Sequence, residues 1–430
     1  LRMYNEYLAP YKAAVDAGVG SVMSSFNIID GIPATANKWL LTDLLRDEWS
    51  FGGLLVTDYN SIAEMASPGI APLKEASVRA LKAGTDMDMV SCGFLNTLEE
   101  SLKEGKIMED QINTACRRVL EAKYKLGLFS NPYKYGDTLR VKEQLYTAEH
   151  RSAARAIASE TFVLLKNENH LLPLGLKGKI ALVGPMADAR NNMCGMWSMA
   201  CTASRHGTLL EGIRSAAGDK AEILYAKGSN VYEDAEMEKA AAGIRPLEHE
   251  DNRKLLDEAL RVASRADVIV AALGECEEMS GESASRTNLE IPDAQQNLLK
   301  ALLKTGKPVV LLLFTGRPLV LNWEDANVHS ILNVWFGGSE TGDAVADVLF
   351  GKVTPSGKLT TTFPRSVGQL PLFYNHLNTG RPDPDNRVFN RYASNYLDES
   401  NEPLYPFGFG LSYTDFVYGD LQISSETLPK

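Results

Sequence analysis

Short apolar runs alternate with segments of helical spacing over the first 130 residues. The runs at 19–26 (VGSVMSSF), 53–56 (GLLV) and 85–90 (TDMDMV) have the length of buried strands. Buried strands that alternate with helices predict βαβ units and a parallel sheet. The segments around these runs carry apolar residues at helical spacing, at 7–17, 39–49, 73–83 and 98–126. The last of these segments predicts two helices, one on each side of a glycine.

A second α/β unit is predicted from residue 179 onward. Its apolar runs indicate strands at 180–183, 223–225, 266–273, 309–314 and 330–335. Helical spacing recurs between them at 255–264, 294–304 and 342–350. This order predicts a second, mostly parallel sheet with loops at its strand ends.

The remaining segments suggest the domain limits. Residues 131–178 have the character of a connector, which leaves 1–130 as the first domain and 179–365 as the second. A stretch rich in glycine, proline and asparagine follows, and we expect 366–415 to form a long loop segment that packs between domains. At 416–430 the pattern turns β-like, as at the start of a truncated all-β domain of fibronectin III type.

Composition narrows the class of protein. The 430 residues are 44% hydrophobic and 23% charged, as in ordinary globular proteins, and the net charge is -11. An acidic chain repels phosphate backbones, so we expect no nucleic acid partner. No apolar run reaches the roughly 18–20 residues of a membrane span, so we expect no membrane insertion. The chain does not open on a signal peptide pattern.

The cysteines and other reactive residues indicate neither a metal nor a cofactor. Five cysteines without short spacing predict no disulfide framework and no zinc site, and six scattered histidines add no metal spacing. Cys194 and Cys201 are close enough to pair, but we expect buried thiols there. The chain has no GxSxG or phosphate-binding motif, and Gly184 and Pro185 lack the spacing of a dinucleotide turn.

Two carboxylates stand out by position. Asp58 lies two residues after the predicted strand 53–56, at the strand end where parallel α/β proteins collect ligands; otherwise it is a helix cap or a salt-bridged loop residue. Glu282 lies in the acidic loop 275–286 (ECEEMSGESASR), which follows another predicted strand; otherwise this loop is simply solvated. Two carboxyl groups can act together in catalysis. One reaction that needs such a pair is the hydrolysis of a glycosidic bond with retention, in which they lie about 5–5.5 Å apart.

An ordered set of motifs carries a family resemblance along the whole chain. The motifs are SFNIIDGIPATANKW (25–39), LTDLLRDEWSFG (41–52), LVTDY (55–59), GESASRTNLEIP (281–292), TGRP (315–318), NVWFGG (333–338), PSGKL (355–359), FPRSVGQLP (363–371) and LYPFGFGLSY (404–413). Together they resemble glycoside hydrolase family 3, particularly its bacterial periplasmic β-glucosidases.

The resemblance implies a fold and a site. The family fold places a (β/α)₈ barrel first and an α/β sandwich second, with the active site at their junction. By resemblance, Asp58 is the nucleophile and Glu282 the general acid/base. Met23, Phe26 and Tyr59 correspond to positions that line the sugar site, although core packing would also explain the first two.

Further expectations follow from the same resemblance. Arg286 would orient the acid/base loop or pair with a carboxylate of that loop. The expected activity is that of a retaining exo-β-glucosidase on β-linked glucosides or oligosaccharides, without cofactor, in the periplasm or secreted. A β-xylosidase or mixed exo-glycosidase is the alternative enzyme, and an inactive or carbohydrate-binding fragment is the alternative from another class.

The length of the first domain departs from the family. A (β/α)₈ barrel takes about 250 residues, whereas residues 1–130 supply its last three βα units. We therefore expect the N-terminal half of the barrel to come from the rest of a longer protein, and the 430 residues alone to be a poor enzyme.

Overall fold

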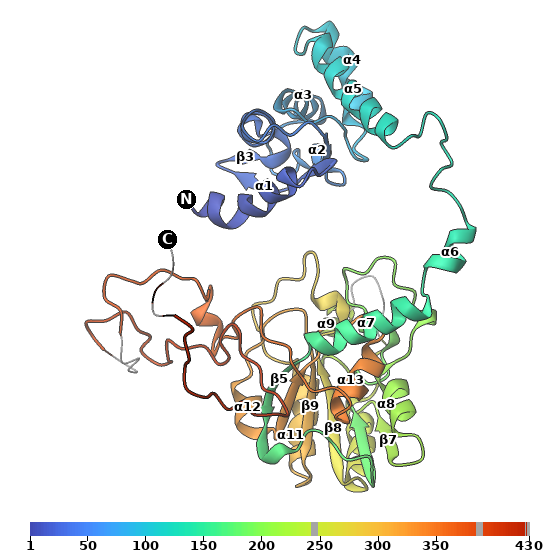
Figure 1. Cartoon of the computed structure of the whole chain (residues 1–430), viewed down its shortest axis with the longest axis vertical. Coiled ribbons are helices and arrows are strands. Elements are labelled where there is room, and N and C mark those ends of the chain that lie inside the picture. Colours follow the sequence, from blue (N-terminus) through green and yellow to red (C-terminus); the bar gives the residue numbers. More distant parts are fainter. Residues whose placement is uncertain (242–247, 384–389, 426, 428–430) are drawn as a thin grey trace. The chain divides into compact units, whose positions relative to one another are not determined.

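The computed structural model describes residues 1–241, 248–383, 390–425 and 427, and the chain divides into two compact units (Figure 1). The first unit is Leu1–Glu143 and the second is Gln144–Lys430. Each is a mixture of helices and parallel strands, as the sequence predicts. Across the described ranges, every helix is too short or too polar to span a bilayer.

The elements of the first unit follow the predicted alternation. They are η1 (Met3–Leu8), α1 (Ala9–Asp16), β1 (Ser21–Ser24), β2 (Ile28–Ile29), β3 (Ile32–Pro33), η2 (Ala34–Ala36), η3 (Trp39–Glu48), β4 (Leu54–Thr57), α2 (Ser61–Glu64), α3 (Leu73–Ala83), α4 (Gly93–Lys103), α5 (Glu109–Lys125) and α6 (Leu139–Gln144), the last of which crosses into the second unit.

Three parallel β segments organise the first unit. Strand β1 pairs with β4 in parallel, from Ser21 opposite Leu54 to Ser24 opposite Thr57. The third predicted strand, 85–90, is reduced to a single parallel bridge between Val56 and Met87. Parallel strands joined through helices are the arrangement of the C-terminal portion of a (β/α)₈ barrel.

A buried charge cluster ties the second and third of these segments together. Asp86 contacts Arg46 at 2.6 Å and Arg118 at 2.9 Å, and it also accepts the backbone N–H of Leu55 at 2.9 Å. Burial lowers the pKa of Arg46, an effect that the negative charge of Asp86 opposes. The cluster explains the charged residue inside the apolar run 85–90: it fastens β4 to the neighbouring segment.

The second unit contains the larger sheet. Its elements are α7 (Ala148–Thr161), β5 (Val163–Asn167), η4 (Glu168–His170), β6 (Lys179–Val183), η5 (Arg190–Met193), η6 (Ala203–Arg205), α8 (Leu209–Ala217), β7 (Glu222–Ala226), α9 (Ala235–Ala241), α10 (Asn252–Ser264), β8 (Val268–Gly274), η7 (Glu277–Met279), α11 (Asp293–Leu303), β9 (Val309–Phe314), α12 (Asn322–Asn327), β10 (Ser330–Asn333), α13 (Thr341–Leu349) and η8 (Val367–Gln369).

The sheet has the strand order β5-β10-β9-β8-β6-β7. All neighbours pair in parallel except β5, which runs antiparallel to β10 at the edge. Strand β5 and helix α7 lie within residues 131–178, which the sequence assigned to a connector. That assignment is wrong for the second half of the segment, because hydrogen bonds to β10, more than 150 residues later, make β5 part of the sheet.

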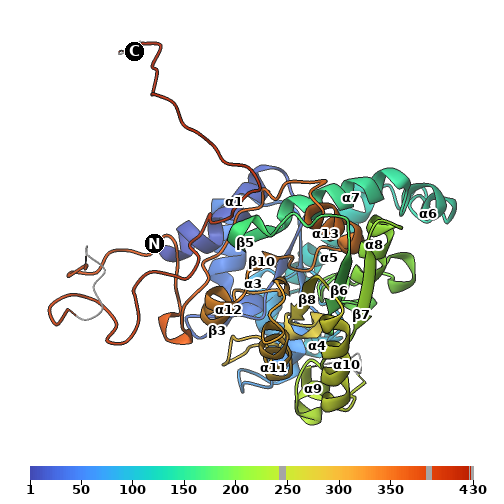
Figure 2. The same ribbon diagram turned by 90° about the horizontal axis from the view of Figure 1, so that it is seen from below.

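Alternate residues of the strands feed two separate cores. Val270 and Ala272 of β8 face a core closed by helices α7, α8 and α13, whereas Ile269, Ala271 and Leu273 face a core closed by α10 and α11. The two helical layers lie on opposite sides of the sheet in Figure 2. Strands buried on both faces are continuous apolar runs, which is why the sequence located them well.

The segment 366–415, which the sequence predicted to be a long loop, packs against the second unit. Leu411 donates its N–H to the carbonyl of Leu164 at 2.8 Å, on the free edge of β5. Phe363 forms an antiparallel bridge with Tyr405, whose ring is buried in the core beneath α10 and α11. This segment therefore covers the sheet edge, which would otherwise expose unpaired backbone groups. Residues 416–425 form no helix or strand, so the all-β domain stays a prediction.

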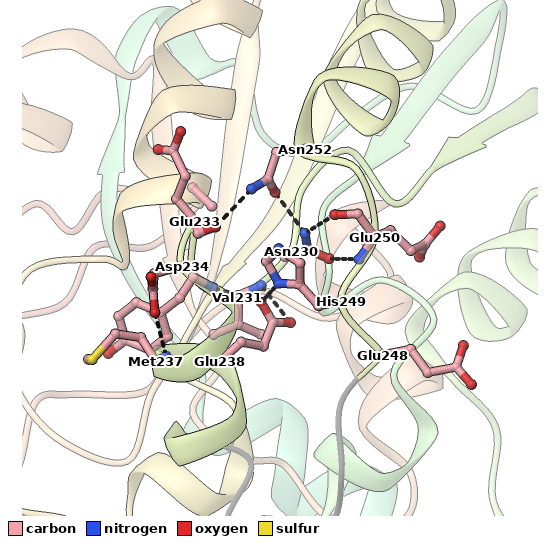
Figure 3. A network of polar contacts seen from close by, with 12 residues as sticks. Asn230, Val231, Glu233, Asp234, Met237, Glu238, Glu248, His249, Glu250 and Asn252 are labelled. Atoms are coloured by element: carbon pink, nitrogen blue, oxygen red, sulfur yellow. Dashed lines mark hydrogen bonds and ion pairs between the residues drawn. The ribbon is translucent and has the colours of Figure 1, made fainter.

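A polar network holds the chain beyond β7 (Figure 3). The side chain of Asn230 donates to the carbonyl of Glu250 at 2.8 Å and to the side chain of Asn252 at 2.7 Å, and it accepts the Glu250 N–H at 3.1 Å. The buried Glu238 carboxylate lies 3.2 Å from His249 Nδ1. These bonds join the end of β7 to the start of α10 and leave Asn230 fully satisfied.

The expectation of free thiols at Cys194 and Cys201 is wrong. The two sulfurs form a disulfide, with the Cα atoms 6.5 Å apart. The loop between β6 and α8 doubles back through the two short helices η5 and η6, and this brings the cysteines together. A separation of seven residues is compatible with either outcome, so only the course of the loop decides between them.

Candidate active site

Asp58 lies one residue beyond the end of β4. Its N–H donates to the carbonyl of Ser24 at 3.2 Å, which extends the β1–β4 ladder by one residue. One carboxylate oxygen accepts the N–H of Tyr59 at 2.6 Å. The side chain is half-buried at the carboxyl end of a parallel strand. Asp58 is therefore held by its backbone and still presents a carboxylate at the edge of the sheet where ligands bind in such folds.

A chain of buried hydroxyl groups supports this strand end. Thr35 Oγ1 lies 2.9 Å from Ser24 Oγ and 2.7 Å from Ser61 Oγ. The N–H of Ser61 in turn donates to the carbonyl of Asp58 at 3.2 Å. The three hydroxyls connect the end of β1, helix η2 and the start of α2. Together they leave the backbone around Asp58 little freedom to move.

The apolar residues predicted beside Asp58 are not core residues of the first unit. Met23 is 50% exposed, Phe26 is 45% exposed and Tyr59 is 62% exposed. Neither Met23 nor Phe26 packs in the core of this unit, and their assignment to the sugar site stays a prediction. Exposed apolar side chains near a strand end suit contact with a ligand or with another part of the protein.

Glu282 lies in the second unit, in the loop that follows β8. Its side chain is exposed, and Ser283 next to it has a positive φ of 54°. The start of the loop is held by Gln295 of α11, whose side-chain amide exchanges two hydrogen bonds of 2.8 Å with the backbone of Gly274. The acidic group thus extends from a well-anchored loop at the carboxyl end of a parallel strand.

Glu275 anchors this loop from within. Its fully buried carboxylate accepts hydrogen bonds from Arg286 Nη1 at 2.7 Å and Thr315 Oγ1 at 2.9 Å. Arg317 Nε lies 3.1 Å from the same carboxylate, without the alignment of a hydrogen bond. The charge of Glu275 is therefore matched by two arginines, which a buried carboxylate requires.

Arg317 also holds the loop on both sides of Glu282. Its Nη2 donates to the carbonyl of Met279 and, at 2.9 Å, to the carbonyl of Ala284. Arg286, which the sequence expected to orient the loop or to pair with a loop carboxylate, pairs with Glu275. The positions of the two arginines and Glu275 restrict the course of the backbone that carries Glu282.

A neighbouring loop packs against the same region. The side-chain oxygen of Asn192 accepts the N–H of Glu277 at 2.5 Å. A methyl group placed on Gly281 would lie 2.6 Å from Cγ of Met196, so the glycine is needed for this close approach. The loop between β6 and α8 therefore forms a wall directly beside the residue that precedes Glu282.

Sequence reasoning missed Glu275, Arg317 and Asp86. Glu275 directly follows a buried strand, as Asp58 does, so the same positional argument would have found it. Arg317 lies inside the motif TGRP, and Asp86 is a charge within an apolar run of strand length. In each case the signal was a polar residue at a position where the pattern predicts burial.

The fold and these loops define a class: an α/β protein of two units that each present a carboxylate at the carboxyl end of a parallel strand. The model of the glycosyl hydrolase family 3 N terminal domain matches residues 1–122, and that of the family 3 C-terminal domain matches residues 162–413. The chain belongs to glycoside hydrolase family 3.

Relatives of known name agree with this membership. The chain is 46% identical to a periplasmic beta-glucosidase of Salmonella typhimurium, over all of this chain and 57% of the relative. It is 36% identical to a beta-xylosidase of Formosa agariphila, over 99% of this chain and 58% of the relative. The chain thus spans little more than half the length of these relatives.

Solved structures are similar to this chain as well. The crystal structure of a β-glucosidase from Listeria innocua in complex with isofagomine matches 96% of this chain and 55% of its own, with a TM-score of 0.84 and 39% identity. A mutant of that enzyme in complex with laminaribiose matches with the same score and identity.

Proposed function

We propose that the protein is a retaining exo-β-glucosidase in which Asp58 is the nucleophile and Glu282 the general acid/base. The observation that carries the proposal is the position of Asp58, locked to β1 and β4 at the carboxyl end of a parallel strand. Such strand ends hold the chemistry of barrel enzymes. Similarity to the β-glucosidases of Salmonella typhimurium and Listeria innocua supports the reaction class.

The reaction takes place in two displacements. In the first, an Asp58 oxygen bonds to the anomeric carbon while the protonated Glu282 carboxyl donates its proton to the departing glycosidic oxygen. In the second, the Glu282 carboxylate removes a proton from water, and the water oxygen displaces Asp58 from the anomeric carbon. Two inversions at the same carbon retain its configuration, and retention requires the two carboxyl groups to lie about 5–5.5 Å apart.

The residues beside Asp58 suit a sugar ligand. Tyr59, Met23 and Phe26 offer exposed apolar surface that would stack on the C–H faces of a glucosyl ring and exclude water. The substrate class follows from the relatives: a terminal β-linked glucosyl residue on a glucoside or oligosaccharide. The remaining groups that grip the sugar would come from the N-terminal half of the barrel. The relative from Salmonella typhimurium also favours a periplasmic or secreted location.

Trapping tests the nucleophile directly. A 2-fluoro β-glucoside with an activated leaving group should inactivate the full-length protein, and peptide mass spectrometry should find the sugar on Asp58. Asp58→Gly should abolish both trapping and hydrolysis, whereas Asp47→Asn, which changes an exposed aspartate of the same unit, should leave both intact. Label on another residue, or hydrolysis that survives in Asp58→Gly, would refute the assignment.

A β-xylosidase is the second candidate, because the Formosa agariphila relative carries that name. The two activities differ in whether the site accepts the hydroxymethyl group at C5 of the sugar. The ratio of kcat/KM for the aryl β-glucoside to that for the matching β-xyloside decides between them. Hydrolysis of neither substrate by the full-length protein would favour the non-catalytic alternative.

A further inference from the structure

Three metal-binding side chains meet in the loop between β6 and α8. Cys194 Sγ lies 3.7 Å and Cys201 Sγ lies 3.5 Å from Nε2 of His206. The three donor atoms all lie within 4.8 Å of one another. Neither Asp58 nor Glu282 belongs to this cluster, and the reaction proposed above does not use it.

The orientation of His206 shows which of its nitrogens carries the proton. Nδ1 lies 3.2 Å from the carbonyl oxygen of Gly207, which can only accept, so the proton belongs on Nδ1. Nε2 then directs its lone pair at the two sulfurs. A backbone carbonyl that fixes the histidine tautomer in this way is the usual partner of a metal-binding imidazole.

The disulfide leaves this lone pair without a donor. His206 is 4% exposed, and the hydrogen-bond neighbours of Nε2 among the described residues are the two sulfurs. Disulfide sulfurs carry no hydrogen, whereas a thiol can donate one and a cation can accept the lone pair. The imidazole is thus better suited to the reduced than to the oxidised cysteines.

The cluster also opens on space for another ligand. A cavity of about 320 Å³ is lined by both cysteines, His206 and the carboxylate-bearing Glu277. A water molecule can therefore occupy a fourth position. Two sulfurs, one nitrogen and one oxygen at tetrahedral angles are a ligand set typical of Zn²⁺.

We propose that the reduced chain binds one thiophilic divalent cation, Zn²⁺ by preference, through Cys194, Cys201 and His206. Cation and disulfide exclude each other. A phosphine or dithiol reductant supplies two electrons to the S–S bond, and two protons complete the thiols; Zn²⁺ then replaces those two protons. Either form closes the loop that contains Met196, which contacts the position next to Glu282.

Metal titration tests the site independently of any glycosidase activity. The purified protein is reduced with a phosphine, freed of reductant without oxygen, and titrated with Zn²⁺ against a chromophoric chelator. We expect one Zn²⁺ per chain in the reduced form and none in the oxidised form. In the reduced form, bound Zn²⁺ should lower the number of thiols that react with a disulfide reagent by two. Co²⁺ should give a sulfur-to-metal charge-transfer band.

Variants identify the ligands. Cys194→Ser, Cys201→Ser and His206→Gln should each weaken binding by more than the roughly 10- to 100-fold that loss of an outer-shell partner costs, because each removes a direct ligand. Cys116→Ser, which changes an exposed free cysteine, and His150→Gln, an exposed histidine, should bind as the wild type does. If a cysteine variant misfolds, His206→Gln alone tests the ligand set. Its charge-transfer band with Co²⁺ should then appear only at a higher Co²⁺ concentration than in the wild type. Absence of Zn²⁺ binding by the reduced wild type, or undiminished binding by His206→Gln, would overturn the proposal.

Discussion

Arg286 donates a hydrogen bond of 2.7 Å to the buried carboxylate of Glu275, eleven positions earlier in the same loop. The pair closes the loop around Glu282, which lies between its two members. Arg317 approaches Glu275 from the loop after β9 and completes the neutralisation of its charge. The position of the proposed acid/base group therefore depends on an ion pair in which Glu282 has no part.

Weakening this pair should impair proton donation more than nucleophilic attack. In Arg286→Lys the planar fork of donors is lost, and a misplacement of about 1 Å costs roughly 100-fold in rate. We expect kcat/KM to fall about 10- to 100-fold for a glucoside with a poor leaving group and much less for a dinitrophenyl glucoside, which needs little protonation. Arg261→Lys, on the exposed face of α10, is the matched control. Equal losses on both substrates would mean that the pair is merely structural.

Removal of Glu282 itself should give a larger effect of the same kind. General acid/base catalysis contributes about 10²- to 10⁴-fold, so Glu282→Ala should lose that factor on poor leaving groups. Azide should restore turnover of an activated substrate and yield β-glucosyl azide, because the small anion needs no base. Glu290→Ala, an exposed glutamate of the same loop, should behave like the wild type. An α-configured product would contradict a retaining mechanism.

Stability of the first unit should depend on Asp86. Asp86→Asn leaves Arg46 with less compensation in a buried site, and breaking a buried ion pair costs about 3–5 kcal/mol. We expect faster hydrogen exchange at the amides of β4 and a lower urea midpoint for this unit. The control is Asp43→Asn, which breaks an exposed pair with Lys38 and should leave the stability nearly unchanged. Unchanged exchange in Asp86→Asn would contradict this account.

Glu324 should make the second unit less stable as the pH rises. Burial raises the pKa of this carboxyl from 4.5 to about 7, and its Oε1 lacks a hydrogen-bond partner among the described residues. Between those two pH values the folded chain holds the proton more tightly than the unfolded chain, so stability falls as the pH rises through this window.

The variant Glu324→Gln should remove this dependence. We expect it to match the wild type near pH 4 and to be more stable at pH 8 by up to about 3 kcal/mol, from about 1.4 kcal/mol per pKa unit. Thermal unfolding at both values measures the difference, with exposed Glu258→Gln as control. A variant that is less stable than the wild type at pH 8 would contradict this account, because it would mean that the ionised carboxylate stabilises the folded chain.

Most of the elements could be predicted because their signals are local. The runs that became β6, β8, β9 and β10 are continuous and apolar, since both faces of those strands are buried. Helix α3 was predicted with its observed limits from spacing alone. Helix α8 was missed although Thr208 and Glu211 form a capping box at its start, a signal that the sequence contains.

Among the site residues, Asp58 and Glu282 were found by their position after predicted strands and by an ordered set of motifs. Both criteria work along the chain, so they needed no coordinates. Their catalytic roles stay predictions. The sequence was less informative about Met23 and Phe26, because an apolar residue after a strand suits a core as well as a ligand site. Both are exposed in the first unit, and their role stays a prediction.

The sequence by itself determined the order of strands and helices and the family to which they belong, because periodicity and motif order are properties of neighbouring residues. Only the tertiary structure decided that β5 joins the sheet, that Glu275 is neutralised by Arg286 and Arg317, and that Cys194, Cys201 and His206 meet. Each of these depends on how the backbone returns to itself, through hydrogen bonds and ion pairs between segments that local spacing does not relate.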